Sequence, residues 1–81
     1  MPPEKTDTDT IHKKRKVFGR NLKAARIEAG LTQNDVVKIT GLTQTFLSRV
    51  ETAQTNISLD NALLLAEVVH QPLCKLLTSE D

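Results

Sequence analysis

The sequence predicts an all-α protein, a compact bundle of five helices. Apolar residues recur at intervals of three and four along most of the chain, which is the period of an amphipathic helix. No stretch alternates polar and apolar residues as a half-buried strand does. Glycine, proline and hydroxyl-bearing residues stand where the periodic segments begin and end, as helix caps do. A chain of 81 residues forms one small domain, so pairing of two copies is a natural way to bury more surface.

The first helix is expected from Ile11 to just before Gly30, because glycine commonly follows a helix end. The apolar residues at helical spacing in this segment are Val17, Phe18, Leu22 and Ala25. Residues 1–10 contain two prolines and no apolar period, so the sequence predicts a disordered arm there. The predicted organisation is an arm over 1–10, a folded domain over 11–78 and a polar tail over 79–81.

Two short helices joined by a tight turn are expected next. Thr32 precedes the segment QNDVVKIT, and Asp35 stands three residues later, a pair that is similar to a capping box. Gly41 ends this helix, and Thr43 is the expected N-cap of the next one, over about 44–51. A supporting helix followed closely by a helix with one apolar and one polar face is typical of a helix-turn-helix DNA reader.

The polar face of the helix at 44–51 is unusual for a solvated surface. Its four members are Gln44, Thr45, Ser48 and Arg49. A merely solvated face would more often carry Glu, Lys and Ala, which favour helix more than Thr and Ser do. Gln can pair with adenine, and Arg with guanine, through two hydrogen bonds. We therefore interpret the four side chains as base-contacting residues, the alternative being an ordinary solvated face.

A fourth and a fifth helix complete the predicted domain. Ser58 is the expected N-cap of LDNALLLAEVV, His70 stands at its expected C′ position, and Pro72 suits the first turn of PLCKLL. The predicted core face of the fourth helix is Leu59, Ala62, Leu63, Ala66 and Val69. That assignment leaves Leu64 and Val68 outside the core. The predicted dimer interface is Leu64, Val68, Leu73 and Leu77.

Charge is polarised along the chain, although the net charge is only +1. Residues 11–49 carry nine Lys or Arg against two acids, a net +7, whereas residues 50–81 carry one Lys against five acids, a net −4. A basic half suits a polyanionic partner such as DNA. The run HKKRK places cations in a first helical turn, where the helix dipole favours acids. We predict phosphate contacts in that run, from Lys13, Lys14 and Arg15.

The composition also argues against several classes of function. The single cysteine, Cys74, excludes an internal disulfide framework, and we expect a buried or interfacial residue rather than a redox switch or a metal ligand. No apolar run is long enough for a secretion signal or a membrane span. No catalytic triad, phosphate loop or metal set is present. We expect a cytoplasmic, nucleoid-associated protein that is not an enzyme, contacts no membrane, and uses no cofactor, metal or small-molecule ligand.

The motifs resemble the XRE-type helix-turn-helix family, which includes lambdoid phage repressors and restriction-modification controller proteins. The resemblance covers about residues 17–77 and rests on LTQNDVVKITGLTQTFLSRVE, NISLDNALLLAEVV and PLCKLL. It implies a lambda-repressor-like fold and a homodimeric transcriptional regulator that binds a palindromic operator in double-stranded DNA, with the helix at 44–51 in the major groove. The family commonly has glycine where this chain has Ala53 and His70.

The resemblance also implies roles for individual residues. The base-contacting positions are occupied by Gln44, Thr45 and Arg49, with Ser48 beside them. The positions that usually hold phosphates are occupied by Gln33, Thr43 and Asn56. The remaining pair, Arg26 and Glu51, corresponds to residues that often form a buried salt bridge in the family.

Two kinds of function are compatible with these features. A DNA-binding regulator would repress by occluding RNA polymerase, or would activate through a contact with polymerase that the acidic half could supply. The alternative is an antitoxin-type protein-interaction module that binds a toxin partner and regulates its own synthesis. An antitoxin usually needs a dedicated segment to wrap its toxin, and only a few residues at each end are spare here, so we favour the regulator.

Overall fold

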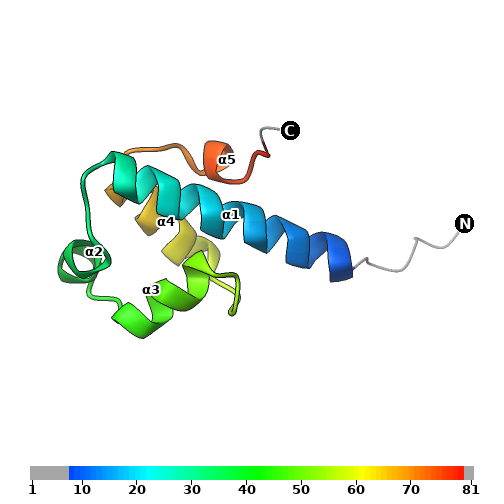
Figure 1. Cartoon of the computed structure of the whole chain (residues 1–81), viewed down its shortest axis with the longest axis horizontal. Helices are drawn as coiled ribbons and strands as arrows, with labels where there is room; N and C mark the ends of the chain where they lie inside the picture. Colours follow the sequence, from blue (N-terminus) through cyan, green and yellow to red (C-terminus); the bar gives the residue numbers. More distant parts are fainter. Residues whose placement is uncertain (1–7, 80–81) are drawn as a thin grey trace, which may run out of the picture.

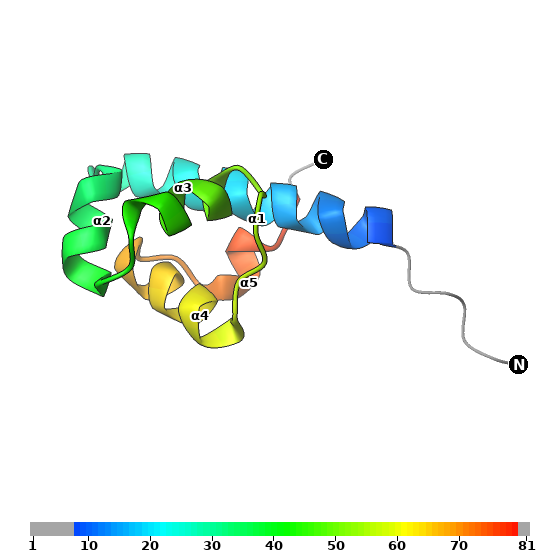
Figure 2. The same ribbon diagram turned by 90° about the horizontal axis from the view of Figure 1, so that it is seen from below.

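A computed structural model describes residues 8–79, and this part of the chain contains five α-helices and no strand (Figure 1). The helices are α1 (Thr8–Glu28), α2 (Gln33–Thr40), α3 (Gln44–Glu51), α4 (Leu59–Val68) and α5 (Leu73–Leu76). The all-α prediction is confirmed. Helix α1 runs along the whole domain, and its N-terminal turns project beyond the other helices (Figure 2).

Helix α1 begins at Thr8, three residues before the predicted start at Ile11. Asp9 lies in its first turn, where an acidic side chain complements the helix dipole. The apolar period could not reveal this turn, because the turn carries no core residue. Residues 8–10 are therefore helical and do not belong to an arm. The rest of the predicted arm, and all of the predicted tail except Ser79, lie outside the described residues.

The predicted caps of α2 and α3 are present. The backbone N–H of Asp35 donates to Thr32 Oγ1 at 3.0 Å, and the backbone N–H of Thr32 donates to Asp35 Oδ2 at 2.9 Å. These hydrogen bonds lower the pKa of Asp35, so their contribution to α2 is lost only as the pH falls through that lowered value. Gly41 ends α2 in the left-handed region, with φ of 78°. Thr43 Oγ1 accepts from the N–H of Phe46 and caps α3.

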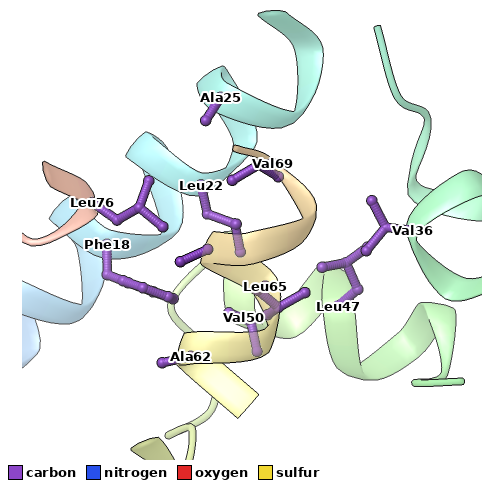
Figure 3. Packing of buried hydrophobic residues seen from close by; sticks show 11 residues of the cluster. Phe18, Leu22, Ala25, Val36, Leu47, Val50, Ala62, Leu65, Val69 and Leu76 are labelled. Carbon is purple, nitrogen blue, oxygen red and sulfur yellow. The ribbon is translucent and has the colours of Figure 1, made fainter. Parts of the chain in front are cut away.

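The core lies where α1, α3 and α4 meet, and α2 and α5 each add a residue to it (Figure 3). Leu22 of α1, Leu47 of α3 and Leu65 of α4 are at most 1% exposed. Burial of each such side chain contributes about 1.5–3 kcal/mol. The other buried members of the cluster are Phe18, Ala25, Val36, Val50, Ala62, Ala66, Val69 and Leu76. This single cluster fixes the positions of all five helices.

The predicted core face of α4 is wrong in part. Leu65 is completely buried, whereas Leu59 and Leu63 are 66% and 45% exposed. Val68, which was predicted to point outward, is half-buried and packs against the core. The cause is the run of three leucines at 63–65, which makes α4 apolar on most of its circumference. Apolar period alone therefore fits more than one rotation of this helix.

Helix α5 is a single turn that closes the bundle against α1. Pro72 is its N-cap and not a residue of its first turn. Leu76 is buried, and the side-chain amide of Asn21 donates to the carbonyl of Leu76 at 3.0 Å and to that of Thr78 at 2.9 Å. Cys74 is exposed, contrary to the prediction of a buried residue. So short a helix buries one position, and Leu76 occupies it.

Two residues other than glycine adopt the left-handed backbone region. They are Ala53, with φ of 62°, and His70, with φ of 61°. Both stand where the resembled family commonly has glycine, and the conformation costs a residue with a Cβ roughly 1–2 kcal/mol. The N–H of His70 donates to Glu67, and the next N–H along the chain donates to Ala66. These hydrogen bonds end α4 as a left-handed cap does.

Gly19 allows α1 and α3 to approach each other closely. A Cβ built at this position would stand 2.6 Å from the carbonyl oxygens of Val50 and Glu51. Real Cβ atoms do not occupy such distances from backbone atoms, so the last turn of α3 lies directly against the backbone of α1. The sequence analysis did not single out this residue, because a glycine within a helix reveals nothing of its neighbours.

We expect Gly19→Ala to lower the free energy of unfolding by about 1–3 kcal/mol, the usual cost of overpacking. In an uncrowded helix interior the same change would add roughly 1 kcal/mol of stability, because alanine favours helix. The sign of the change, measured by denaturant unfolding followed by circular dichroism, therefore decides. A variant more stable than the parent would show that α1 and α3 do not meet here.

Candidate nucleic-acid interface

The four predicted base-contacting residues lie on the outer face of α3. The opposite face buries Leu47, Val50 and Glu51. The side chains of Gln44, Thr45 and Arg49 are exposed and that of Ser48 is half-buried. Helix α3 lies at the surface, beside α1 and α2 (Figures 1 and 2). Its polar side is therefore free to meet a partner.

These side chains share one concave surface with two glutamines from other segments. The concave surface, called the α3 polar surface below, is lined by Gln33, Gln44, Thr45, Ser48, Arg49 and Gln54. The backbone N–H of Gln54 donates to the carbonyl of Arg49 at 2.7 Å, which folds the following loop back onto α3. Sequence reasoning missed Gln54, because a loop residue belongs to no helical period and only its polarity marks it.

The residues expected to hold phosphates near α3 occupy different surroundings. Gln33 belongs to the α3 polar surface. Thr43 and Asn56 are exposed just before and after α3. The hydroxyl of Thr43 accepts the hydrogen bond that caps the helix, so its free valence for a phosphate is its own O–H.

The cations expected to hold phosphates do not join the α3 polar surface. Lys13, Lys14 and Arg15 lie in the N-terminal half of α1. Lys14 and Arg15 line a groove between α1, α4 and α5, which is otherwise apolar. Lys13 is exposed and shares its face of α1 with Lys16, three residues on.

Arg26 and Glu51 form a buried ion pair behind the α3 polar surface. Arg26 Nε donates to Glu51 Oε2 at 2.7 Å, and the second contact, from Arg26 Nη2 to Glu51 Oε1, is 3.1 Å long. Arg26 Nη1 also donates to the carbonyl of Leu31 at 3.0 Å. The two side chains are 9% and 2% exposed. The pair joins the last turns of α1 and α3 to the segment before α2.

Gln33 connects this ion pair to the α3 polar surface. Its Nε2 donates to Glu51 Oε1 at 3.0 Å, and its Oε1 accepts from Gln44 Nε2 at 3.5 Å, a long hydrogen bond. A carboxylate can only accept hydrogen bonds. Gln33 must therefore turn its NH₂ group toward Glu51 and its oxygen toward Gln44. The buried charge thus determines which end of the Gln44 amide faces Gln33.

Two further properties concern membranes and metals. Among residues 8–79, no helix combines the length and the apolar character needed to cross a bilayer. In the same part of the chain, no three His, Cys, Asp or Glu side chains are grouped as metal ligands would be.

We expect Arg26→Met to destabilise the protein by about 3–5 kcal/mol, because the Glu51 carboxylate would stay buried without its cation. The variant Arg26→Met/Glu51→Leu removes both charges and should recover most of that loss. Denaturant unfolding of the two variants and the parent measures both effects. A single variant within roughly 0.5 kcal/mol of the parent, as for ordinary surface changes, would contradict a stabilising role for the pair.

Comparison with known proteins gives consistent sequence relatives. The helix-turn-helix family model matches residues 22–76. The control protein C.SmaI of Serratia marcescens is 27% identical over 66 residues, which are 82% of this chain and 79% of that protein. An HTH-type transcriptional regulatory protein of Pyrococcus horikoshii is 37% identical over 60 residues, which are 74% of this chain and 19% of that protein. The chain thus spans about a fifth of the length of the Pyrococcus relative.

Two solved structures are also similar. The restriction-modification controller protein C.AhdI from Aeromonas hydrophila has a TM-score of 0.71 and 32% identity, over 76% of this chain and 94% of that chain. The hypothetical transcription factor NHTF from Neisseria has a TM-score of 0.77 and 27% identity, over 99% of this chain and 88% of that chain. The family match begins at residue 22, so residues 8–21 of α1 precede it.

Proposed function

Because this chain belongs to the helix-turn-helix family of DNA-binding transcriptional regulators, we propose that it binds a palindromic operator as a homodimer and reads bases with α3. The family is a class of regulators and not of enzymes. The observation that carries the proposal is the α3 polar surface, on which hydrogen-bonding side chains gather along one exposed helix. The major groove of DNA admits an α-helix. None of the six residues that line this surface is acidic, so none repels phosphates.

Gln44 and Arg49 are the principal readers in this proposal. Gln pairs with the N7 and N6 atoms of adenine, and Arg pairs with the O6 and N7 atoms of guanine. Thr45 and Ser48 lie beside them on the same surface and would contact neighbouring bases. An operator half-site would then contain both an adenine and a guanine. Each good contact is worth about 1–3 kcal/mol of discrimination against the wrong base.

The hydrogen bond from Gln44 to Gln33 supports the choice of adenine. Adenine presents an acceptor and a donor in a fixed order in the major groove. An amide that cannot flip presents its own donor and acceptor in one order only. Because Glu51 orients Gln33, and Gln33 accepts from Gln44, the Gln44 amide enters the groove with its orientation already set.

Contacts to the DNA backbone would come from three places. Gln33, Thr43 and Asn56 surround α3 and would position it over the bases. The cations of α1 that include Lys13, Lys14 and Arg15 would add affinity for any sequence, by neutralising phosphates. Such contacts make binding weaker as salt increases.

The homodimer would present two copies of α3 to successive major grooves, about 34–36 Å apart on one side of the duplex. The interface proposed from the sequence is Leu64, Val68, Leu73 and Leu77. Leu64 and Leu77 are 38% and 51% exposed, but Val68 and Leu73 pack against the core of their own chain. A dimer bound over a promoter would repress by occluding RNA polymerase. One bound beside it would present the acidic side of α4 to polymerase.

We expect Gln44→Ala and Arg49→Lys each to remove about 1–3 kcal/mol of discrimination at one operator position. Lysine keeps the charge but cannot make the two parallel hydrogen bonds of arginine. Titration of duplexes that differ in one base pair, by fluorescence anisotropy, measures the loss. The control Asn56→Ala should weaken binding to every sequence equally. The base-reading role of α3 fails if both variants discriminate as the parent does.

We expect Gln33→Leu to reduce the preference of the protein for adenine at the position that Gln44 reads, by roughly 1 kcal/mol. A loss of a phosphate contact alone would lower affinity for all bases and leave their ratio unchanged. In a Gln44→Ala background, Gln33→Leu should therefore have no further effect on the ratio. An unchanged ratio in the single variant would mean that Gln33 does not orient Gln44.

A further inference from the structure

An apolar groove of about 270 Å³ lies between the N-terminal half of α1 and the helices α4 and α5. Its apolar walls include Ile11 and Phe18 from α1, Leu59 and Ala62 from α4, and Leu73 and Leu77 from α5. None of its lining residues belongs to the α3 polar surface. DNA binding through α3 therefore leaves this groove unused.

The groove exposes more aliphatic surface than a lone small domain needs to. Ile11, Leu59 and Leu77 are 42%, 66% and 51% exposed. Leu63, one turn after Leu59 on α4, extends this surface and is 45% exposed. Single exposed apolar residues are ordinary, but a contiguous group around a hollow marks an interaction site.

The properties of the groove identify its occupant as a second copy of this chain. Its volume is below the roughly 300–1,000 Å³ of pockets for drug-sized ligands, so it suits inserted side chains. Lys14 and Arg15 stand at its edge. The exposed acids Asp60 and Glu67 lie seven residues apart, on one face of α4. A second copy would bring these acids to the basic edge.

A two-fold dimer requires one surface that complements itself. The surface around this groove has that property, because the hollow lies beside an exposed leucine of α4, Leu63. In a two-fold arrangement each copy can place this leucine in the groove of the other. The same arrangement sets the basic edge of one copy against the acids of the other, in both directions.

We propose that the dimer contact of this regulator is centred on the groove, with α4 of each copy packed against α1, α4 and α5 of the other. The inference rests on the homodimer of the proposed function and specifies its surface. Residues 8–21 of α1 precede the family match and supply one wall of the groove. The first turns of α1 are therefore a dimerisation element of this chain. Leu64, about 100° around α4 from Leu63, lies outside the groove.

Sedimentation equilibrium of Ile11→Glu and Leu59→Glu tests this assignment. Both residues lie near helix N-termini, where glutamate is favourable, so the fold should persist, as circular dichroism would verify. We expect the Kd of the dimer to rise at least tenfold in each variant. The matched control is Ile39→Glu on α2, where the isoleucine is 60% exposed but remote from the groove. Its Kd should stay within about twofold of the parent.

The remaining outcomes separate this proposal from the base-reading proposal. A folded Ile11→Glu variant that dimerises like the parent overturns the groove assignment, as does loss of the dimer in Leu64→Glu alone. A parent protein that is monomeric when it binds a single half-site specifically also overturns it, while base reading by α3 survives. If the groove variants lose the dimer but the parent selects no DNA sequence, the groove assignment stands and the proposed function fails.

Discussion

The contact between the last turns of α1 and α3 is the constraint on which the rest of the structure depends. Gly19 lets the two backbones meet, and the Arg26–Glu51 ion pair holds them behind the exposed side chains of α3. A buried ion pair adds little stability over an apolar pair, but its hydrogen bonds demand one geometry. Here that geometry extends through Gln33 to Gln44. The position of α3 and the orientation of a predicted base-reading amide thus have one origin.

Helix α1 would connect the two proposed activities of the molecule. Its 21 residues span roughly 30 Å at 1.5 Å per residue. Arg26 near one end holds α3, and Ile11 near the other end lines the apolar groove. A rigid helix between a dimer contact and a base-reading helix would fix the separation of the two α3 helices. The spacing of operator half-sites would then depend on α1.

Local signals made much of this fold predictable. Thr32, Thr43 and Ser58 cap their helices through hydrogen bonds within four residues, so the sequence alone identifies them. The polar face of α3 was predictable for the same reason, because helical period needs no tertiary information. The rotation of α4 and the role of Gly19 were not, since they depend on what other helices place opposite them. Gln54 belongs to the same class, because only the fold of its loop brings it to α3.

Selection of bound duplexes from a random pool, followed by titration of the best sequence at two salt concentrations, tests the central claim most directly. The account predicts an inverted repeat whose half-sites lie about one helical turn apart, each with an adenine and a guanine, bound far more tightly than random DNA. Weak, steeply salt-dependent binding without any repeat would contradict it, because phosphate contacts alone behave in that way. The polar side of α3 would then have a protein partner instead.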